Sequence, residues 1–193
     1  MRQGRCRLHA GLMVRRPHVG IAGRLDVFLR EFDFEQLRCR WIEADPDEVW
    51  RGLMEVRPID LALARRWTIV RGKPLSPGLL SVLAGEPQLM LAHEQNRFAV
   101  YGLIERPGHH LSSTRNGTTI DEFIRFDEPC WIKRLTGFEL SPSGNGTRLC
   151  VTTRVARTDP VIRRWRKLRG LLDRPRASVA QRNVLDAVGR LAG

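Results

Sequence analysis

His93 and Glu94 form the pair that opens the H-E-x-x-H helix of zinc proteases. In that motif two histidines share one helix face and bind Zn²⁺, and the glutamate acts as the general base. Here Arg97 stands where the second histidine must be. The intervening residues Glu94-Gln95-Asn96 are typical of a tight turn, on which two ligands could not share a helix face. The sequence therefore predicts no metal centre at this position.

Other residues with catalytic chemistry do not form a recognised motif. The chain has no G-x-S-x-G elbow, P-loop or G-x-G-x-x-G loop. His109-His110 falls in a predicted loop, where solvated side chains are the plain interpretation and a general base at a pocket mouth is the alternative. Glu105 and Glu139 sit near the ends of predicted strands and could act as acid or base if buried. We assign no catalytic residue and no cofactor, and a non-enzyme is the favoured hypothesis.

The cysteines are far apart and include no C-x-x-C pair, which argues against a structural metal site. Cys39, Cys130 and Cys150 each fall in a strand-like segment, whereas Cys6 lies in the N-terminal extension. A buried thiol in a strand behaves as a small hydrophobic side chain. We therefore predict buried thiols at these three positions, in preference to a disulfide or a reactive thiol.

The net charge of +12 is concentrated at the two ends of the chain. Residues 1–24 carry six Arg and no acid, and residues 154–193 carry eleven basic residues against three Asp, whereas residues 25–153 carry sixteen basic residues against eighteen acids. A nucleic acid or an anionic membrane surface is thus an alternative partner, through the basic side of the terminal helix. We disfavour the nucleic acid because no aromatic residue interleaves that side for base stacking. The residues concerned are Arg163, Arg164, Arg166, Lys167 and Arg169.

Length and hydropathy favour one globular domain in the cytoplasm. The 193 residues are 42% hydrophobic and 28% charged, which is ordinary globular composition. No stretch approaches the length of a membrane-spanning helix. The run Gly11–Val14 is cut off by Arg15-Arg16, so the basic N-terminus lacks the apolar core of a secretory signal.

The first predicted strand, Phe34 to Glu43, alternates between two faces. Leu37, Cys39 and Trp41 point one way and Arg38 and Arg40 the other, which is typical of a half-buried strand. A helix follows from Pro46 to about Val56, with Asp45 and Glu48 placed as a capping box, and Asp60 can open a second one. A run of antiparallel strands comes next, with the predicted bounds Gln88–His93, Arg97–Glu105, Thr118–Phe126, Cys130–Leu140 and Thr147–Arg157.

The period changes at the C-terminal end. Asp159 and Pro160 predict a helix start, and an apolar stripe then recurs every three or four residues. Pro175 is expected to break or kink this helix. The stripe contains Val161, Ile162, Trp165, Leu168 and Leu172.

This order of elements resembles the START-like, or helix-grip, superfamily, which includes polyketide cyclases and lipid-transfer domains. The resemblance is carried by the first strand with Ala44–Trp50, by Phe123–Trp131 with Phe126-Asp127-Glu128-Pro129, and by Thr152–Trp165 with Thr158-Asp159-Pro160. The last two segments look like a bacterial branch of the superfamily. The likeness covers residues 24–193 and leaves residues 1–23 as a basic, loosely ordered extension. It implies an α+β fold in which a curved antiparallel sheet of about six strands wraps around a long C-terminal helix.

The resemblance also implies a cavity between sheet and helix that holds a small hydrophobic ligand such as a lipid or polyketide. An aromatase/cyclase-type enzyme that uses the same cavity is the alternative. Aromatic side chains suit such a wall because they offer a large apolar area and, for Trp and Tyr, one polar group, although the same residues could simply fill the core. The sequence indicates no oligomeric state. The expected ligand-binding residues are Trp41, Trp67, Phe98, Tyr101, Trp131, Val151, Trp165 and Leu168.

Overall fold

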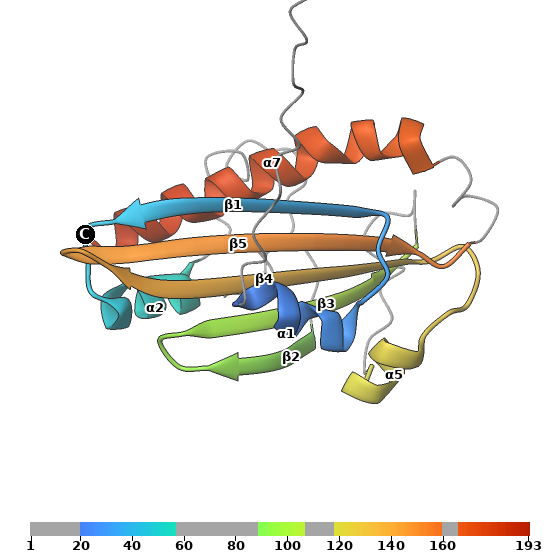
Figure 1. Ribbon diagram of the computed structural model, residues 1–193, viewed down its shortest axis with the longest axis horizontal. Coiled ribbons are helices and arrows are strands. Elements are labelled where there is room, and N and C mark those ends of the chain that lie inside the picture. Colours follow the sequence, from blue (N-terminus) through green and yellow to red (C-terminus); the bar gives the residue numbers. More distant parts are fainter. Residues whose placement is uncertain (1–19, 57–88, 107–117, 160–165) are drawn as a thin grey trace, which may run out of the picture.

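The computed structural model describes residues 20–56, 89–106, 118–159 and 166–193, with the side chains of the last segment described from residue 178 onward. These residues form an antiparallel sheet with helices on both sides (Figure 1). In chain order the elements are α1 (Ile21–Phe28), β1 (Phe34–Ile42), α2 (Pro46–Glu55), β2 (Leu89–Glu94), β3 (Phe98–Glu105), α5 (Ile120–Arg125), β4 (Ile132–Ser143), β5 (Gly146–Arg157) and α7 (Arg166–Leu191).

The sheet has five strands in the order β1-β5-β4-β3-β2. β2 to β5 lie side by side in chain order, each antiparallel to the next. β1 lies at the edge of the sheet next to β5, to which it is also antiparallel. The turn between β4 and β5 places Gly144 at a φ of +62°, a conformation that glycine adopts without a steric penalty. The α+β fold class is confirmed, with an antiparallel sheet on which the long C-terminal helix packs.

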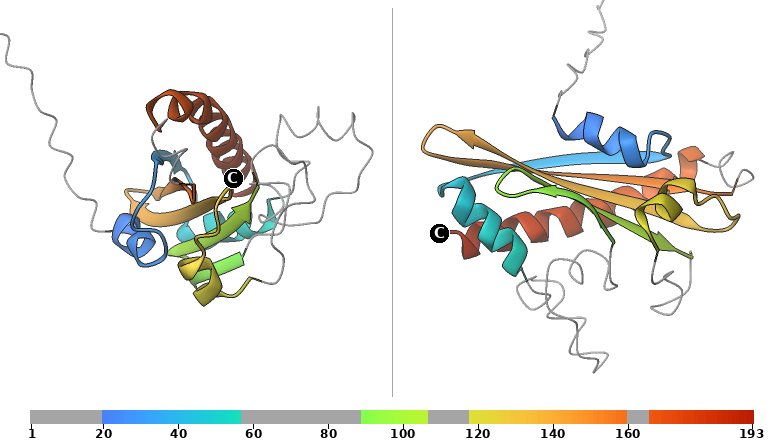
Figure 2. Two further views of the ribbon diagram at one scale, coloured as in Figure 1. Left: turned by 90° about the vertical axis from the view of Figure 1, so that its right-hand side faces the viewer. Right: turned by 90° about the horizontal axis from the view of Figure 1, so that it is seen from below.

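Helices cover both faces of the sheet (Figure 2). α2 and the C-terminal part of α7 pack on one face, which we call the α7 face, around buried residues that include Leu53, Phe138 and Val188. α1 and α5 pack on the other, which we call the α1 face, around residues that include Leu25, Phe123 and Leu135. Strand residues contribute alternately to the two cores, as the period of a strand requires.

One of the strands predicted from the sequence is a helix. Thr118 to Phe126 contains α5, not a strand. The side chain of Thr119 accepts a hydrogen bond from the backbone N–H of Glu122, and the Glu122 carboxylate accepts one from the backbone N–H of Thr119. This capping box satisfies the first amides of a helix. The described sheet therefore has five strands where about six were predicted.

Of the helices predicted from the sequence, one is confirmed, one is longer than expected and one lies outside the described residues. α2 begins at Pro46 with the predicted capping box of Asp45 and Glu48. Pro175 does not end the terminal helix, because α7 runs without interruption from Arg166 to Leu191. The predicted domain boundary at residues 23 and 24 falls inside α1. The second helix predicted from Asp60 and the helix start predicted at Pro160 lie outside the described residues.

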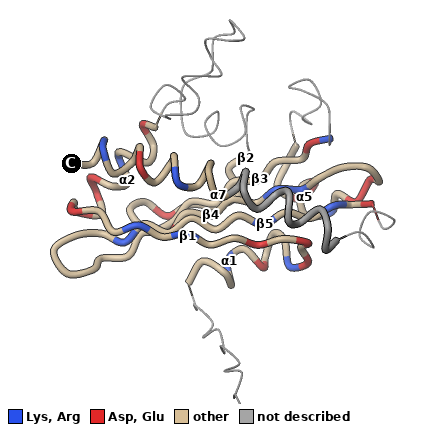
Figure 3. Tube along the Cα trace, turned by 90° about the horizontal axis from the view of Figure 1, so that it is seen from above, with Lys and Arg blue, Asp and Glu red and all other residues tan. Residues whose placement is uncertain are grey.

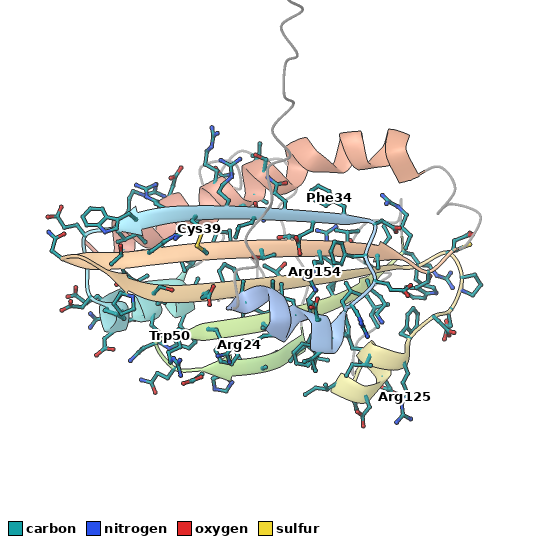
Figure 4. All side chains as sticks on the ribbon, in the orientation of Figure 1. Arg24, Phe34, Cys39, Trp50, Arg125 and Arg154 are labelled. Carbon is teal, nitrogen blue, oxygen red and sulfur yellow. A yellow bond between two sulfur atoms is a disulfide. The ribbon has the colours of Figure 1, made fainter. Side chains whose placement is uncertain are left out.

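Arg154 of β5 fixes α1 on the sheet (Figure 4). Its side chain is only 4% exposed, yet it forms ion pairs with Asp26 of α1 at 2.6 Å and with Glu35 of β1 at 2.7 Å. It also donates to the carbonyl of Leu29 at 3.0 Å, and its guanidinium lies 4.5 Å from the centre of the Phe32 ring. One buried cation thus holds the α1 segment to β1 and β5.

Replacing this arginine should destabilise the protein strongly. We expect Arg154→Met to lower the free energy of unfolding by about 3 kcal/mol, because the acids and carbonyls that it satisfies lose their partner. Arg97→Met is the matched control. The Arg97 side chain is 65% exposed beside Glu94, and exposed pairs contribute about 1 kcal/mol or less. Urea unfolding measures both values, and equal losses would contradict the role given to Arg154.

Candidate functional site

The α7 face changes character along its length. At one end the sheet residues Phe138, Leu140, Leu149 and Val151 close against α2 and α7 in a core whose members are all 7% exposed or less. Towards the other end of β4 and β5, the same face turns polar. Side chains of one strand that share a face are two residues apart. Phe138 on β4 and Val151 on β5 are apolar, and the next residues on the same face, Thr136 and Thr153, are polar.

A band of polar side chains crosses the sheet at this point. Gln36 of β1 lies opposite Thr153 of β5, Thr153 lies opposite Thr136 of β4, and Thr136 lies opposite Tyr101 of β3. Thr136, Thr153 and Tyr101 are 3%, 8% and 1% exposed. We call these four residues the polar band. It spans four adjacent strands, and α7 lies over its β1 and β5 members.

Gln181 of α7 lies over the polar band and is 2% exposed. Its amide nitrogen donates to the carbonyl of Gln36 at 3.1 Å and to the Thr153 hydroxyl at 3.0 Å. Its amide oxygen, however, has no hydrogen-bond partner. The helix is therefore tied to the edge strand by a polar contact that leaves one buried acceptor unused.

Three more buried polar atoms on the same face have no partner. They are Gln36 Oε1, Arg38 Nε and Arg134 Nε. Each arginine is anchored elsewhere, Arg38 by a hydrogen bond from Nη2 to Ser178 of α7 and Arg134 by an ion pair with Glu105. Within the described part of the chain, every buried unpaired side-chain polar atom belongs to this face of the sheet or to Gln181 above it.

Buried side-chain polar atoms without a hydrogen-bond partner are rare in native proteins. Leaving a buried donor or acceptor unpaired costs about 1 to 3 kcal/mol, so native proteins pair most of them with protein, water or ligand. The four atoms, two donors and two acceptors, lie on this face at and on either side of the polar band. The polar band, Gln181 and the two arginines thus form the candidate site.

The structure divides the residues predicted from the sequence between the two faces. Tyr101 and Val151 both lie on the α7 face in the closed core, and Tyr101 is also the β3 member of the polar band. Phe98 and Trp131 belong to the core on the α1 face. Trp41 also points to the α1 side, is 46% exposed, and donates from its indole to the carbonyl of Ser143 at 3.1 Å. These five residues therefore do not line one common space.

The alternation predicted for β1 is correct, but the face predicted to point into the protein core beneath the terminal helix is wrong. Leu37, Cys39 and Trp41 do share one face, but it is the face away from α7. Arg38 and Arg40 point towards the helix, where Arg40 forms an ion pair with Asp186. Charged side chains can face a helix when their ends find partners on it, because their long stems cover apolar surface.

Several candidates from the sequence lie outside the part of the molecule that can be described. They are Trp67, Trp165, the side chain of Leu168, and His109-His110. Glu105 lies on the α7 face in its pair with Arg134, whereas Glu139 lies on the α1 face and lines a surface pocket there. No catalytic arrangement follows from these positions.

The prediction of three buried thiols is wrong. Cys39 and Cys150, which lie opposite each other in β1 and β5, form a disulfide across a sequence separation of 111 residues. Cys130 is a free, exposed thiol at a φ of +68°, just before β4. Periodicity identified the strands correctly but gave no register between β1 and β5, and the register is what brings the two sulfurs together.

The described ranges contain neither a candidate metal site nor a helix suited to span a membrane. In residues 20–56, 89–106, 118–159 and 166–193 no group of three or more His, Cys, Asp or Glu side chains is placed to hold a metal ion. None of the helices in those ranges combines the length and apolar character needed to cross a bilayer.

Comparisons with known proteins add little to this picture. No family model and no curated protein matches the chain. Solved structures that align with 82% of it include TTHA0849 from Thermus thermophilus, with 14% identity over 97% of that chain and a TM-score of 0.36. Mll3558 from Rhizobium loti aligns over 96% of its length with 17% identity and a TM-score of 0.42. CV1439 from Chromobacterium violaceum aligns over 96% of its length with 12% identity and a TM-score of 0.40. At these scores the likeness supports no functional argument, and the fold assignment rests on the strand order and helix packing.

Tyr101, the single tyrosine in the chain, reports on the packing at the end of the polar band. Its hydroxyl lies 3.9 Å from the Met54 sulfur, and burial raises its pKa from 10.0 to about 12. The folded protein thus holds this proton more tightly than the unfolded chain does. The resulting stability is fully present below pH 10.0 and is lost as the pH rises towards 12.

Tyrosinate absorbance should therefore appear in the native protein only near pH 12 and in the urea-unfolded chain near pH 10. Tyr101→Phe provides the blank for the tryptophan background. A native titration that coincides with the unfolded one would show that water reaches the hydroxyl and that this part of the core is open.

Proposed function

We propose that the protein binds a small molecule between α7 and the sheet, and that the molecule has an apolar body and a hydrogen-bonding end. The observation that carries the proposal is the group of unpaired buried atoms on Gln36, Arg38, Arg134 and Gln181. The START-like fold class supports it by analogy, since a space between sheet and terminal helix is where such folds bind ligands.

The composition of the site favours the chemistry of that end. Arg38 and Arg134 offer guanidinium N–H groups, which form their strongest hydrogen bonds with carboxylates and phosphates. The side chains of Phe34 and Val155, which are paired in the β1–β5 ladder on the same face, are each 6% exposed and offer apolar contact. An amphipathic acid, such as a fatty acid or an acidic polyketide, satisfies both demands.

The other hypotheses gain no support of this kind. The aromatase/cyclase alternative needs an acid or histidine facing open space, and Glu105 on this face is engaged by Arg134. The basic residues that suggested a nucleic acid or membrane partner lie in a part of the chain whose side chains cannot be described. Acidic and basic residues are interspersed over the described elements (Figure 3). These partners and the cytoplasmic location stay predictions.

The direct test is native mass spectrometry of the full chain purified from its own host. We expect a stoichiometric complex with one small molecule that dissociates on unfolding. A host-purified protein that carries nothing, and that also fails to bind the probe described next, would overturn the proposal.

Arg38 and Arg40 provide a matched pair for locating the site. Both lie on β1 and on the α7 face, but Arg38 has an unpaired buried Nε whereas Arg40 is half exposed and paired with Asp186. We expect Arg38→Met to weaken binding of a fluorescent fatty acid about tenfold or more, because a hydrogen bond to a charged group contributes about 1.5 to 3 kcal/mol. Arg40→Met should change the affinity by less than about twofold.

Fluorescence titration gives both dissociation constants, and thermal unfolding checks that both variants fold. Equal effects of the two substitutions, or none from Arg38→Met, would place the probe elsewhere.

A further inference from the structure

The Cys39–Cys150 disulfide lies on the α1 face of the sheet (Figure 4), where Cys39 is half-buried and Cys150 is 8% exposed. Its neighbours on the same face of β1, Leu37 and Trp41, are each 46% exposed. The two strands are already held together by a ladder that pairs every residue from Phe34 to Ile42 with β5. A small molecule can therefore reach the sulfur of Cys150 only through an opening beside it.

A pocket of about 180 Å³ opens beside this disulfide. Cys150 forms part of its wall, together with Leu37, Glu139 and Arg148, and Gly20 and Ile21 at the start of α1 close one side. One water occupies about 30 Å³ in the liquid, so the pocket has room for a molecule of several non-hydrogen atoms. Of the two sulfur-bearing residues, Cys150 is the one on the pocket wall.

The other sulfur has a cation beside it. Arg148 Nη2 lies 3.6 Å from Cys39 Sγ. A neighbouring guanidinium stabilises a thiolate, and a better-stabilised thiolate leaves faster in disulfide exchange. The pocket therefore offers a route to Cys150, and Arg148 favours departure of Cys39.

We propose that Cys39–Cys150 is a reversible exchange site for a small aminothiol. The thiolate of the first aminothiol forms a bond with Cys150 Sγ, the Cys39–Cys150 bond breaks, and its electron pair stays on Cys39 as a thiolate beside Arg148. A second aminothiol thiolate attacks the sulfur of the first, which releases the aminothiol disulfide and leaves Cys150 as a thiolate. The two aminothiols are oxidised and the protein disulfide is reduced, with two electrons transferred.

The amine is assigned from Glu139. This residue lies opposite Cys150 in the β4–β5 ladder, and its side chain lines the same pocket. A carboxylate on the wall attracts an ammonium group and disfavours an anionic thiol. A thiol with a protonated amine two carbons away thus pairs its charge with Glu139 while its sulfur reaches Cys150.

Cysteamine and 2-mercaptoethanol are the probes, since they differ in an amine against a hydroxyl. The experiment uses the full chain with Cys6→Ser and Cys130→Ser, so that the disulfide provides the remaining cysteines. Alkylation and mass spectrometry follow loss of the disulfide and locate the mixed disulfide. We expect reaction without denaturant and an adduct on Cys150.

Two variants test the roles of the charged residues. Arg148→Gln should slow the loss of the disulfide, because a thiolate without a neighbouring cation is a poorer leaving group. Arg125→Gln is its control, an exposed arginine on α5 at the far end of the molecule (Figure 4). Glu139→Gln should lower the ratio of the cysteamine rate to the 2-mercaptoethanol rate, and the exposed carboxylate variant Glu31→Gln should not. The ratio in urea-unfolded protein gives the intrinsic reactivity of the two thiols.

Reaction in urea but not in the native protein would show a structural cross-link and overturn the proposal. So would an adduct on Cys39, an unchanged rate in Arg148→Gln, or a rate ratio that Glu139→Gln leaves unchanged. None of these results bears on ligand binding beneath α7, which lies on the opposite face of the sheet and is measured separately.

Discussion

The pairing of β1 with β5 is the interaction on which the rest of the structure depends. β1 lies at the edge of the sheet, and its pairing with β5 joins the N-terminal segment to the meander. Because both faces of β1 are used, one strand positions two sets of groups. Its even-numbered residues reach α7 through Arg38 and Arg40, and its odd-numbered residues carry Glu35 to Arg154 and Cys39 to Cys150.

Helices cover both faces of the sheet, so polar residues on either face are buried and need hydrogen-bond partners within the protein. A sheet with one wet face can place its threonines and glutamines in water, whereas this one buries them between layers. The polar band therefore depends for its hydrogen bonds on the layer that covers it. Gln181 supplies some of them and leaves others unused. A site of this composition differs from the purely apolar cavity that the aromatic residues suggested.

Local signals in the sequence predicted most of the fold. The alternation in Phe34–Glu43 and the capping box at Asp45 each specify structure within a few residues, and each is found. Thr118–Phe126 was misread because a short helix and a short strand with few apolar residues have similar patterns, although Thr119 and Glu122 carry a usable cap signal.

The site was harder to predict, because it depends on which strands are neighbours. Gln36, Thr136 and Thr153 carry no signal alone and form a row only once the β1–β5 and β4–β5 registers are known. The same register pairs Cys39 with Cys150. The face of β1 that packs against α7 was predicted wrongly for a related reason. Helices lie on both sides of the sheet, so the hydrophobicity of the β1 side chains does not show which face lies against α7.

The separation of β1 from β5 along the chain has a consequence for how the molecule assembles. β2–β3 and β4–β5 are each joined by a turn short enough for these two hairpins to form early, whereas docking β1 must close a loop of more than a hundred residues against chain entropy. The edge strand is thus expected to join a nearly finished sheet late in folding. Until it does, β5 presents an open edge to other chains, which makes the interval before docking the period of greatest risk of aggregation.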